Sequence, residues 1–141
     1  MNPVSGFSLW DLESDIISAI ESKGWTKPTE IQLEAIPIGR KGLDIVGQAK
    51  TGSGKTAAFG IPLLEKCSKS GNVQAVVLCP TRELAVQVAE EMDSLQGKKG
   101  LEIQTVYGGV DLEKQAKKLS QGVDIVVGTP GRVIDMTKRK F

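Results

Sequence analysis

Short apolar runs rich in valine and isoleucine recur along this chain and constrain its fold more than any other feature. They are "DIVGQ" at 44–48, "AVVLC" at 75–79, "IQTVY" at 103–107 and "DIVVG" at 124–128. The stretches between them have the apolar spacing of helices. Because alternating strands and helices pack as a parallel sheet with crossover helices, the pattern predicts an α/β fold.

The leading part of the chain has helical spacing around 12–20 and again from near Thr29. This part precedes the first apolar run, and no linker composition separates the two. We therefore predict a helical segment at 1–38 joined to a sheet domain at 39–141.

Charge and composition exclude several classes of function. Eighteen Lys and Arg against seventeen Asp and Glu give a net charge of +1, so any anion site must be local. The chain has no histidine and only two cysteines, which excludes imidazole-based catalysis and a disulfide framework. No leader pattern or membrane-length apolar run is found, so we expect a cytoplasmic protein without a membrane partner.

The sequence "GSGKT" at 52–56 follows an apolar run and precedes a helix-forming stretch. Glycines allow backbone angles that residues with a Cβ resist, so N–H groups can turn around an anion. Lys55 would reach the β and γ phosphates of a nucleotide, and the Thr56 hydroxyl would bind Mg²⁺. The pattern predicts a P-loop (Walker A), although the general pattern has glycine where Ala49 stands.

Upstream, "GWTKPTEIQ" at 24–32 places Gln32 after a proline-stiffened turn. A glutamine can bond the N6 and N7 edge of adenine, and guanine offers O6 there instead. Phe7 offers a ring on which a base stacks. The structural alternative is that Gln32 is a helix-surface amide and that Phe7 and Trp25 are core anchors.

Downstream, "PTRELAVQ" at 80–87 and "TPGR" at 129–132 place threonine and arginine after apolar runs and at expected helix starts. Ligands of open α/β sheets bind beyond the carboxyl ends of the strands. These groups can hold a phosphodiester backbone without reading its sequence. The alternative is that the threonines only cap helices and that the glycine pair at 108–109 is an ordinary turn.

Together these segments resemble the DEAD-box RNA helicases over essentially the whole chain. Phe7 and "GWTKPTEIQ" are similar to the upstream aromatic and the Q motif, "AKTGSGKT" to motif I, "PTRELA" to motif Ia, "GG" to the glycine motif and "TPGR" to motif Ib. The resemblance implies a RecA-like P-loop NTPase domain that uses ATP and Mg²⁺. It also implies that ATP hydrolysis is coupled to unwinding RNA duplexes or remodelling RNA–protein complexes.

The resemblance implies roles for the matched residues. ATP binding falls to Phe7, Trp25, Thr29, Gln32, Ala49, Thr51, Gly52, Ser53, Gly54, Lys55 and Thr56. Of these, Lys55 and Thr56 are the candidate catalytic residues, and Thr56 is also the candidate Mg²⁺ ligand. Sequence-nonspecific RNA binding falls to Pro80, Thr81, Arg82, Gly108, Gly109, Thr129, Pro130, Gly131 and Arg132.

The sequence departs from the family pattern most at its end, because it contains no D-E-A-D or S-A-T segment and no second domain. The resemblance is therefore to the amino-terminal part of the first RecA-like domain. Metal-positioning carboxylates and arginine fingers supply most of phosphoryl-transfer catalysis. We expect this chain to hydrolyse ATP poorly or not at all, and to be marginally stable if its P-loop strand has an unpaired edge.

Two other functions stay open at this point. One is a non-catalytic fragment that binds nucleotide or RNA without hydrolysis. The other is an unrelated P-loop phosphotransferase or transporter ATPase, which predicts no link between Gln32 and adenine and no effect of RNA.

Overall fold

The computed structural model describes residues 6–50 and 52–138. Its elements are η1 (Phe7–Trp10), α1 (Ser14–Ser22), α2 (Glu30–Arg40), α3 (Lys55–Lys66), β1 (Ala75–Leu78), α4 (Arg82–Leu95), β2 (Ile103–Val106), α5 (Leu112–Ser120), β3 (Ile125–Gly128) and α6 (Pro130–Lys138). They form two compact units. Unit 1 is Met1–Lys66 with Ser94–Lys99, and unit 2 is Cys67–Asp93 with Gly100–Phe141.

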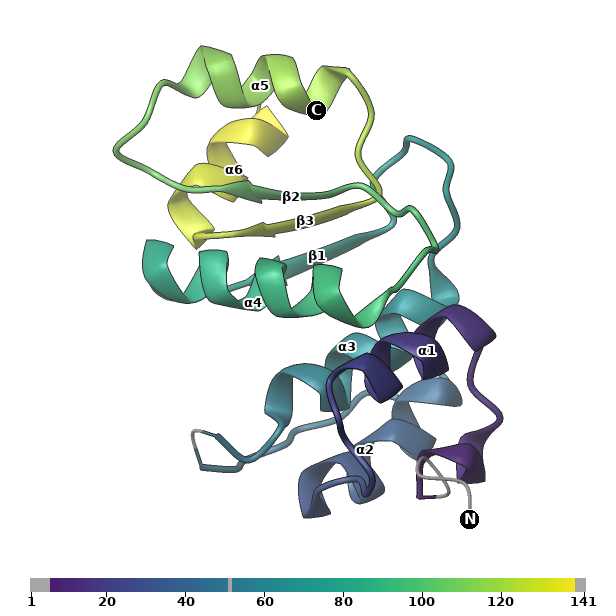
Figure 1. Cartoon of the computed structure of the whole chain (residues 1–141). Coiled ribbons are helices and arrows are strands. Elements are labelled where there is room, and N and C mark those ends of the chain that lie inside the picture. Colours follow the sequence, from purple (N-terminus) through teal and green to yellow (C-terminus); the bar gives the residue numbers. More distant parts are fainter. Residues whose placement is uncertain (1–5, 51, 139–141) are drawn as a thin grey trace. The chain divides into compact units, whose positions relative to one another are not determined.

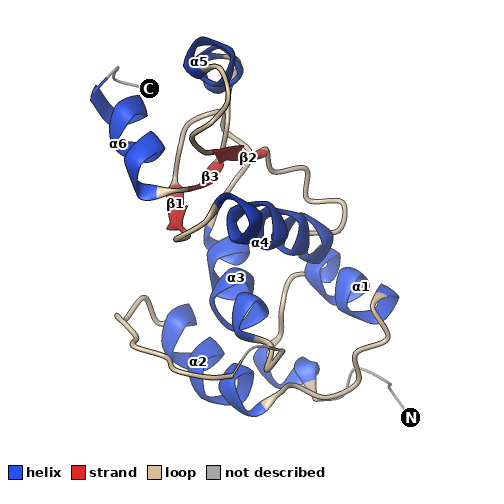
Figure 2. Cartoon of the chain, turned by 90° about the vertical axis from the view of Figure 1, so that its left-hand side faces the viewer, coloured by secondary structure: helices blue, strands red, loops and turns tan. Residues whose placement is uncertain are grey.

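Unit 2 is built on a three-stranded parallel sheet in the order β1-β3-β2. Ala75 and Ile103 both lie opposite Ile125 in the register, so β3 is paired along both edges. Helices α5 and α6 cover one face of the sheet and α4 covers the other (Figures 1 and 2). The α/β class and three of the four expected strands are confirmed.

The core of unit 2 explains why β3 is buried at every position. One hydrophobic cluster joins the inner faces of α5 and α6 to β2 and β3 through Val106, Ala116, Leu119, Val123, Val126 and Met136. At Gly128 an added Cβ would lie 2.5 Å from the Val106 side chain and 2.8 Å from that of Val133. The close approach of β2 and α6 at this end of the sheet therefore depends on a glycine.

The amino end of the sheet is held by the buried carboxylate of Asp124. Its Oδ1 accepts hydrogen bonds from the backbone N–H groups of Ser70 at 3.0 Å and Gly71 at 2.9 Å, and its Oδ2 accepts one from Glu102 at 2.9 Å. Burial by itself raises the pKa of this carboxyl, but the three backbone hydrogen bonds outweigh that effect and lower the pKa. One side chain thereby fixes the starts of β2 and β3 and the loop before β1.

Unit 1 is helical, with α2 packed against α3. A Cβ at Gly39 would lie 3.0 Å from the ring of Pro62, so the two helices touch almost backbone to backbone there. Ile16, Ile20, Ile36, Ile61 and Leu64 are fully buried. The helices expected around 12–20 and from Thr29 are thus present, and α3 begins at Lys55, the lysine of the predicted P-loop.

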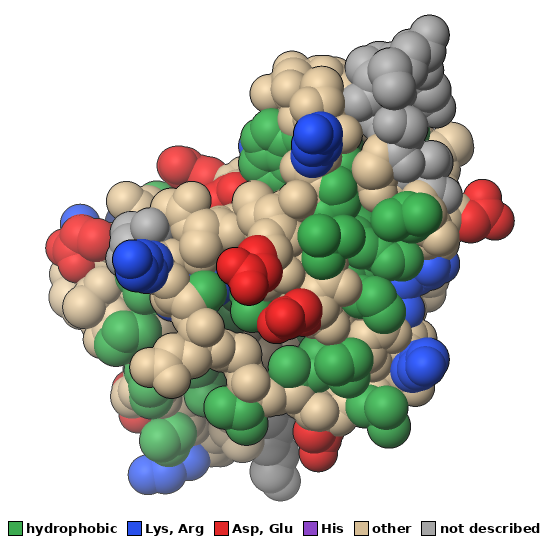
Figure 3. Space-filling model, turned by 90° about the horizontal axis from the view of Figure 1, so that it is seen from below, with side chains coloured by type: hydrophobic (Ala, Val, Ile, Leu, Met, Phe, Trp, Pro, Cys, Tyr) green, Lys and Arg blue, Asp and Glu red, His purple; other side chains and the backbone are tan. Residues whose placement is uncertain are grey.

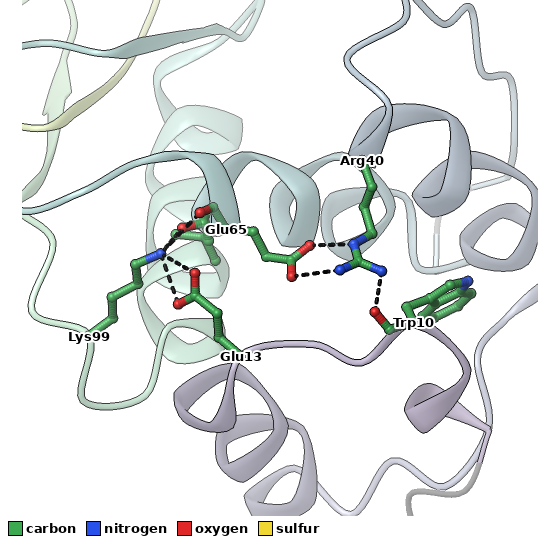
Figure 4. A network of polar contacts seen from close by, with 6 residues as sticks. Trp10, Glu13, Arg40, Glu65 and Lys99 are labelled. Carbon is green, nitrogen blue, oxygen red and sulfur yellow. Dashed lines mark hydrogen bonds and ion pairs between the residues drawn. The ribbon is translucent and has the colours of Figure 1, made fainter.

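A chain of polar contacts joins the ends of these helices (Figure 4). Arg40 pairs with Glu65 at 2.9 Å and also donates to the Trp10 carbonyl, while Lys99 pairs with Glu13 at 3.0 Å and donates to the carbonyl of Leu64. Burial raises the pKa of the Glu65 carboxyl, although its pairing with Arg40 opposes that rise. The network ties η1 and α1 to the helices that carry the P-loop and Gln32.

The expectation of a buried strand at 44–48 is wrong. Residues 43–50 have no regular secondary structure, and Val46 is completely exposed. No strand of the described chain pairs with this run, and an apolar run forms a strand only where a neighbouring strand bonds to it. The loop that precedes α3 therefore lacks a strand to support it.

Exposed apolar side chains accompany this missing pairing. Figure 3 shows hydrophobic side chains in several groups between single charged ones on the face drawn there. Large apolar side chains are exposed in unit 1 at Leu33, Leu43, Ile45, Val46 and Phe59, and in unit 2 at Val76 and Leu78 of β1. Among the described residues, no helix is long and apolar enough to cross a membrane.

Candidate functional site

The P-loop region of unit 1 places a tight glycine turn at the start of α3. Gly52 and Gly54 have φ angles of +81° and +89°, which L side chains rarely adopt. The first helical hydrogen bond runs from Ala58 N–H to the Gly54 carbonyl, so the N–H groups of Lys55 and Thr56 have no partner within α3. Lys55 is exposed and Thr56 half-buried. Thr51 lies outside the described residues.

Ser53 lies between these two glycines and carries an orphaned polar atom. Its hydroxyl oxygen is buried and has no hydrogen-bond partner, the only such side-chain atom in the part of the chain that the structure describes. Its backbone N–H is already used, because it donates to the Lys50 carbonyl at 3.1 Å. A buried hydroxyl without a partner is costly unless a ligand satisfies it. The turn thus fits a group rich in hydrogen-bond acceptors, such as a phosphate.

Gln32 lies beside this turn and is 2 % exposed. Its Oε1 accepts from the Thr29 N–H at 3.0 Å, which completes the capping box at the start of α2. Its Nε2 donates to the Gly54 carbonyl at 3.2 Å. Both ends of the amide are therefore engaged by the protein, so Gln32 is not a surface amide and joins α2 to the P-loop.

The two aromatic residues expected near the base lie in the core of unit 1. Phe7 is fully buried and stacks on Trp25, with ring centroids 6.3 Å apart and the planes 24° from parallel. It also meets Trp10 edge to face at 6.1 Å. Trp25 is half-buried, with the Lys23 ammonium 5.2 Å from its ring. Stacking of a base on Phe7 would first require exposure of its ring.

In unit 2 the expected RNA-binding segments meet at one end of the sheet. Residues 79–81, 107–109 and 129–131 follow β1, β2 and β3 directly, and the carboxyl ends of parallel strands share one edge. Thr81 accepts a hydrogen bond from the Leu84 N–H at 3.2 Å and so caps α4, as expected. Most of the expected residues are exposed, namely Pro80, Thr81, Arg82, Gly108, Gly109, Pro130 and Gly131, whereas Thr129 is half-buried.

Arg82 opens α4 at this edge and lies over an aromatic ring. Its guanidinium carbon is 5.1 Å from the centroid of the Tyr107 ring, within the range of a cation–π contact. The turn at 108–109 is next to it, since a Cβ on Gly109 would lie 3.8 Å from Arg82 Nη1. The first and second of the expected RNA-binding segments, which follow β1 and β2, are thus in direct contact.

Arg132 differs sharply from Arg82. Its Nη1 and Nη2 donate to the Val110 carbonyl at 3.2 and 3.1 Å, and Nη1 also donates to Gln115 Oε1 at 2.8 Å. A weak ion pair with Asp135 at 3.9 Å uses a further nitrogen, and the side chain is 11 % exposed. Arg132 therefore braces the loop after β2.

Three contributors to this edge were missed from the sequence. Tyr107 could have been found, because an aromatic directly after a strand and before two glycines must lie at the same edge as Arg82. Gln115 and Val110 carry no comparable signal. Their contacts with Arg132 arise from the packing of α5 beside α6.

The chain is similar to known proteins over almost its whole length. A family model described as DEAD/DEAH box helicase matches residues 29–141. The chain is 48 % identical over 135 residues to the DEAD-box ATP-dependent RNA helicase CshA of Streptococcus pneumoniae, covering 95 % of this chain and 26 % of that protein. It is 46 % identical to CshA of Bacillus subtilis, with 95 % and 27 % covered.

A solved structure shares the fold as well. The crystal structure of a DEAD box protein from the hyperthermophile Methanococcus jannaschii matches with a TM-score of 0.90 and 47 % identity, over 96 % of this chain and 37 % of that one. The chain thus spans about a quarter of the length of the curated relatives it matches.

Proposed function

This chain belongs to the DEAD/DEAH box helicase family, and we propose on that basis that it is the ATP- and RNA-binding portion of an RNA helicase. In such a protein, ATP binding and hydrolysis are coupled to separation of RNA strands or remodelling of RNA–protein complexes. The observation that carries the proposal is the P-loop turn, where a buried and unpartnered Ser53 hydroxyl lies between two left-handed glycines at a helix start.

Phosphates would be held by the backbone of Gly52, Ser53 and Gly54 together with the ammonium of Lys55. The α3 start supports this role, because its free N–H groups and partial positive charge favour an anion. Mg²⁺ would be bound through the Thr56 hydroxyl, and it would supply charge neutralisation at the phosphates. The side chains present fit both groups.

Adenine would be recognised by Gln32. Its amide has one acceptor and two donors, which match the N6 and N7 edge of adenine. Because both ends of the amide are engaged in this structure, the bond to the Gly54 carbonyl must be released or shared when the base binds. Selectivity for adenine would therefore be linked to the shape of the P-loop.

RNA would lie across the carboxyl edge of the sheet in unit 2. Thr81, the α4 start and the exposed Arg82 can contact phosphodiester oxygens, and the turn at 108–109 allows close approach of the main chain. Such contacts carry no base information, so we expect binding to be sequence-nonspecific and sensitive to salt.

ATP hydrolysis requires groups other than those that bind the nucleotide. The sequence contains no D-E-A-D segment, whose carboxylates would position the metal and the attacking water. The second candidate function, a module that binds nucleotide and RNA without hydrolysis, is favoured by this observation for the 141 residues alone. Measuring phosphate release with and without RNA separates the two.

The test is a calorimetric titration of the chain with Mg·ADP, Mg·ATP and Mg·GTP. We expect binding of the adenine nucleotides only, and loss of that preference in Gln32→Ala and Gln32→Glu. The glutamate keeps the acceptor for the Thr29 N–H and so preserves the helix cap, but it replaces the donor to the Gly54 carbonyl with a negatively charged oxygen. Gln87→Ala, an exposed glutamine on α4, is the control. Equal binding of GTP and ATP by the unaltered chain would refute the adenine assignment.

A further inference from the structure

The two arginines at the carboxyl edge of unit 2 are held in opposite ways. Arg132 has its guanidinium nitrogens engaged by the Val110 carbonyl and the Gln115 amide. Arg82 is exposed, and no group in the described part of the chain accepts a hydrogen bond from it. Its N–H donors are therefore available to a ligand.

The position of Arg82 is electrostatically unusual. It is the first residue of α4, where the helix end already carries a partial positive charge, and a cation is more favourable at the opposite end. A guanidinium at this place gains nothing from the helix, and no carboxylate of residues 6–50 or 52–138 pairs with it. The guanidinium instead lies over the Tyr107 ring, with its carbon 5.1 Å from the ring centroid.

An aromatic face is well suited to hold this group. Arginine is planar, stacks on aromatic rings and presents its N–H edge to a phosphate in a bidentate arrangement. A ring beneath the plane fixes its position without consuming the donors, because the contact is with the π face. The turn at Gly109 lies beside the same guanidinium, so the edge of the plane lies where a backbone could approach.

We propose, resting on the RNA-binding function above, that Tyr107 is a positioning residue that holds Arg82 against its ring and aims the guanidinium edge at an RNA phosphate. Arg132 has a different task, which is to brace the loop 108–110 from behind. Of the two arginines, only Arg82 contacts RNA in this arrangement. The phenol hydroxyl of Tyr107 has no part in it.

The experiment is fluorescence anisotropy with a labelled decauridine RNA, Mg²⁺ and a non-hydrolysable ATP analogue, at KCl concentrations from about 50 to about 200 mM. We expect Tyr107→Leu to weaken binding by about two- to fivefold, the range of an exposed cation–π contact. Tyr107→Phe restores binding, because the ring face is kept. Arg82→Ala weakens binding further and reduces the slope of log affinity against log salt by about 0.7.

The double variant separates positioning from other roles. With Arg82→Ala already present, Tyr107→Leu should have no additional effect. An equal loss in both backgrounds would mean that the ring contacts a base itself or only supports the fold, and the proposal would be wrong. Lys118→Ala, which removes an exposed charge near the end of α5, is the charge control and should change affinity less than about twofold.

Two further outcomes are informative. If circular dichroism shows Tyr107→Leu to be unfolded, Arg82→Lys decides, since lysine keeps the charge but not the stacked plane. Unchanged affinity in that variant overturns the proposal. A folded unaltered chain that binds no RNA refutes both the proposed function and this inference, whereas normal RNA binding by Tyr107→Leu refutes the inference alone.

Discussion

Replacing Asp124 with asparagine tests how the sheet of unit 2 is anchored. Its Oδ1 accepts from Ser70, Gly71 and the Gln74 side chain, and its Oδ2 accepts from Glu102. An asparagine that keeps its oxygen at the Oδ1 position must point its NH₂ group at the Glu102 N–H, so two donors face one another. A buried donor without a partner costs about 1–3 kcal/mol, and we expect that loss of unfolding free energy at neutral pH.

The unfolding free energy lost in Asp124→Asn should depend on pH with a definite sign. The pKa of Asp124 is lowered in the folded chain, so its contribution to stability is complete above the unfolded pKa of about 3.9. It disappears as the pH falls through the lower, folded pKa. Asparagine does not titrate. The difference between the two proteins should therefore be constant above about pH 5 and should shrink below about pH 4.

Urea unfolding followed by circular dichroism at several pH values measures this difference. The matched control is Asp111→Asn, because Asp111 is an exposed cap of α5 that accepts from the Glu113 N–H at 2.9 Å. Asparagine caps helices about as well as aspartate, so the control should cost less than about 0.5 kcal/mol. Equal losses in the two variants, or a loss from Asp124→Asn that persists unchanged at low pH, would refute this account of the anchor.

Two further predictions concern the site. Gly54→Ala should destabilise the chain by more than about 1–2 kcal/mol, since its φ is +89° and the new Cβ would lie 2.5 Å from Gln32 Nε2 and 2.8 Å from Thr29 Oγ1. Gly52 has φ +81° but nothing within 4 Å of an added Cβ, so Gly52→Ala should cost only the strain of the left-handed backbone. Urea unfolding measures both variants, and equal losses of unfolding free energy would argue against the contact of the Cβ added at Gly54 with Gln32 and Thr29. Arg132→Lys should lower stability by about 1 kcal/mol through its lost hydrogen bonds. It should leave the salt slope of RNA binding unchanged, and a slope reduced by about 0.7 would show that Arg132 contacts phosphate after all.

The strands that the sequence predicted correctly are those that have partners. β1, β2 and β3 each match a Val- and Ile-rich run, and β3 pairs with both neighbours. The run at 44–48 has the same composition and is exposed coil instead. Apolar alternation shows that a segment suits a sheet, but pairing depends on which strand lies beside it. Composition alone does not contain that information.

Gln32 illustrates the same limit at the level of a single side chain. The sequence indicates an amide at the third position of a capped helix, and the capping box with Thr29 follows from that spacing. The bond from Gln32 to the Gly54 carbonyl does not follow, because it joins residues 22 apart in the sequence. That bond links the candidate adenine-binding residue on α2 to the glycine turn before α3.

The two arginines differ for a reason that can be read from their places in their helices. Both follow a threonine after an apolar run, which made them equivalent in sequence. Arg82 is the first residue of α4, whereas Arg132 is the third residue of α6, after Pro130 and Gly131. At about 100° per residue, two positions along a helix turn a side chain through about 200°, to nearly the opposite face. Relative to its own helix, an arginine at the first position can therefore point out over the strand ends, while one at the third position points back against the neighbouring helix. Arg82 accordingly contacts Tyr107 just beyond β2, and Arg132 bonds to Gln115 on α5.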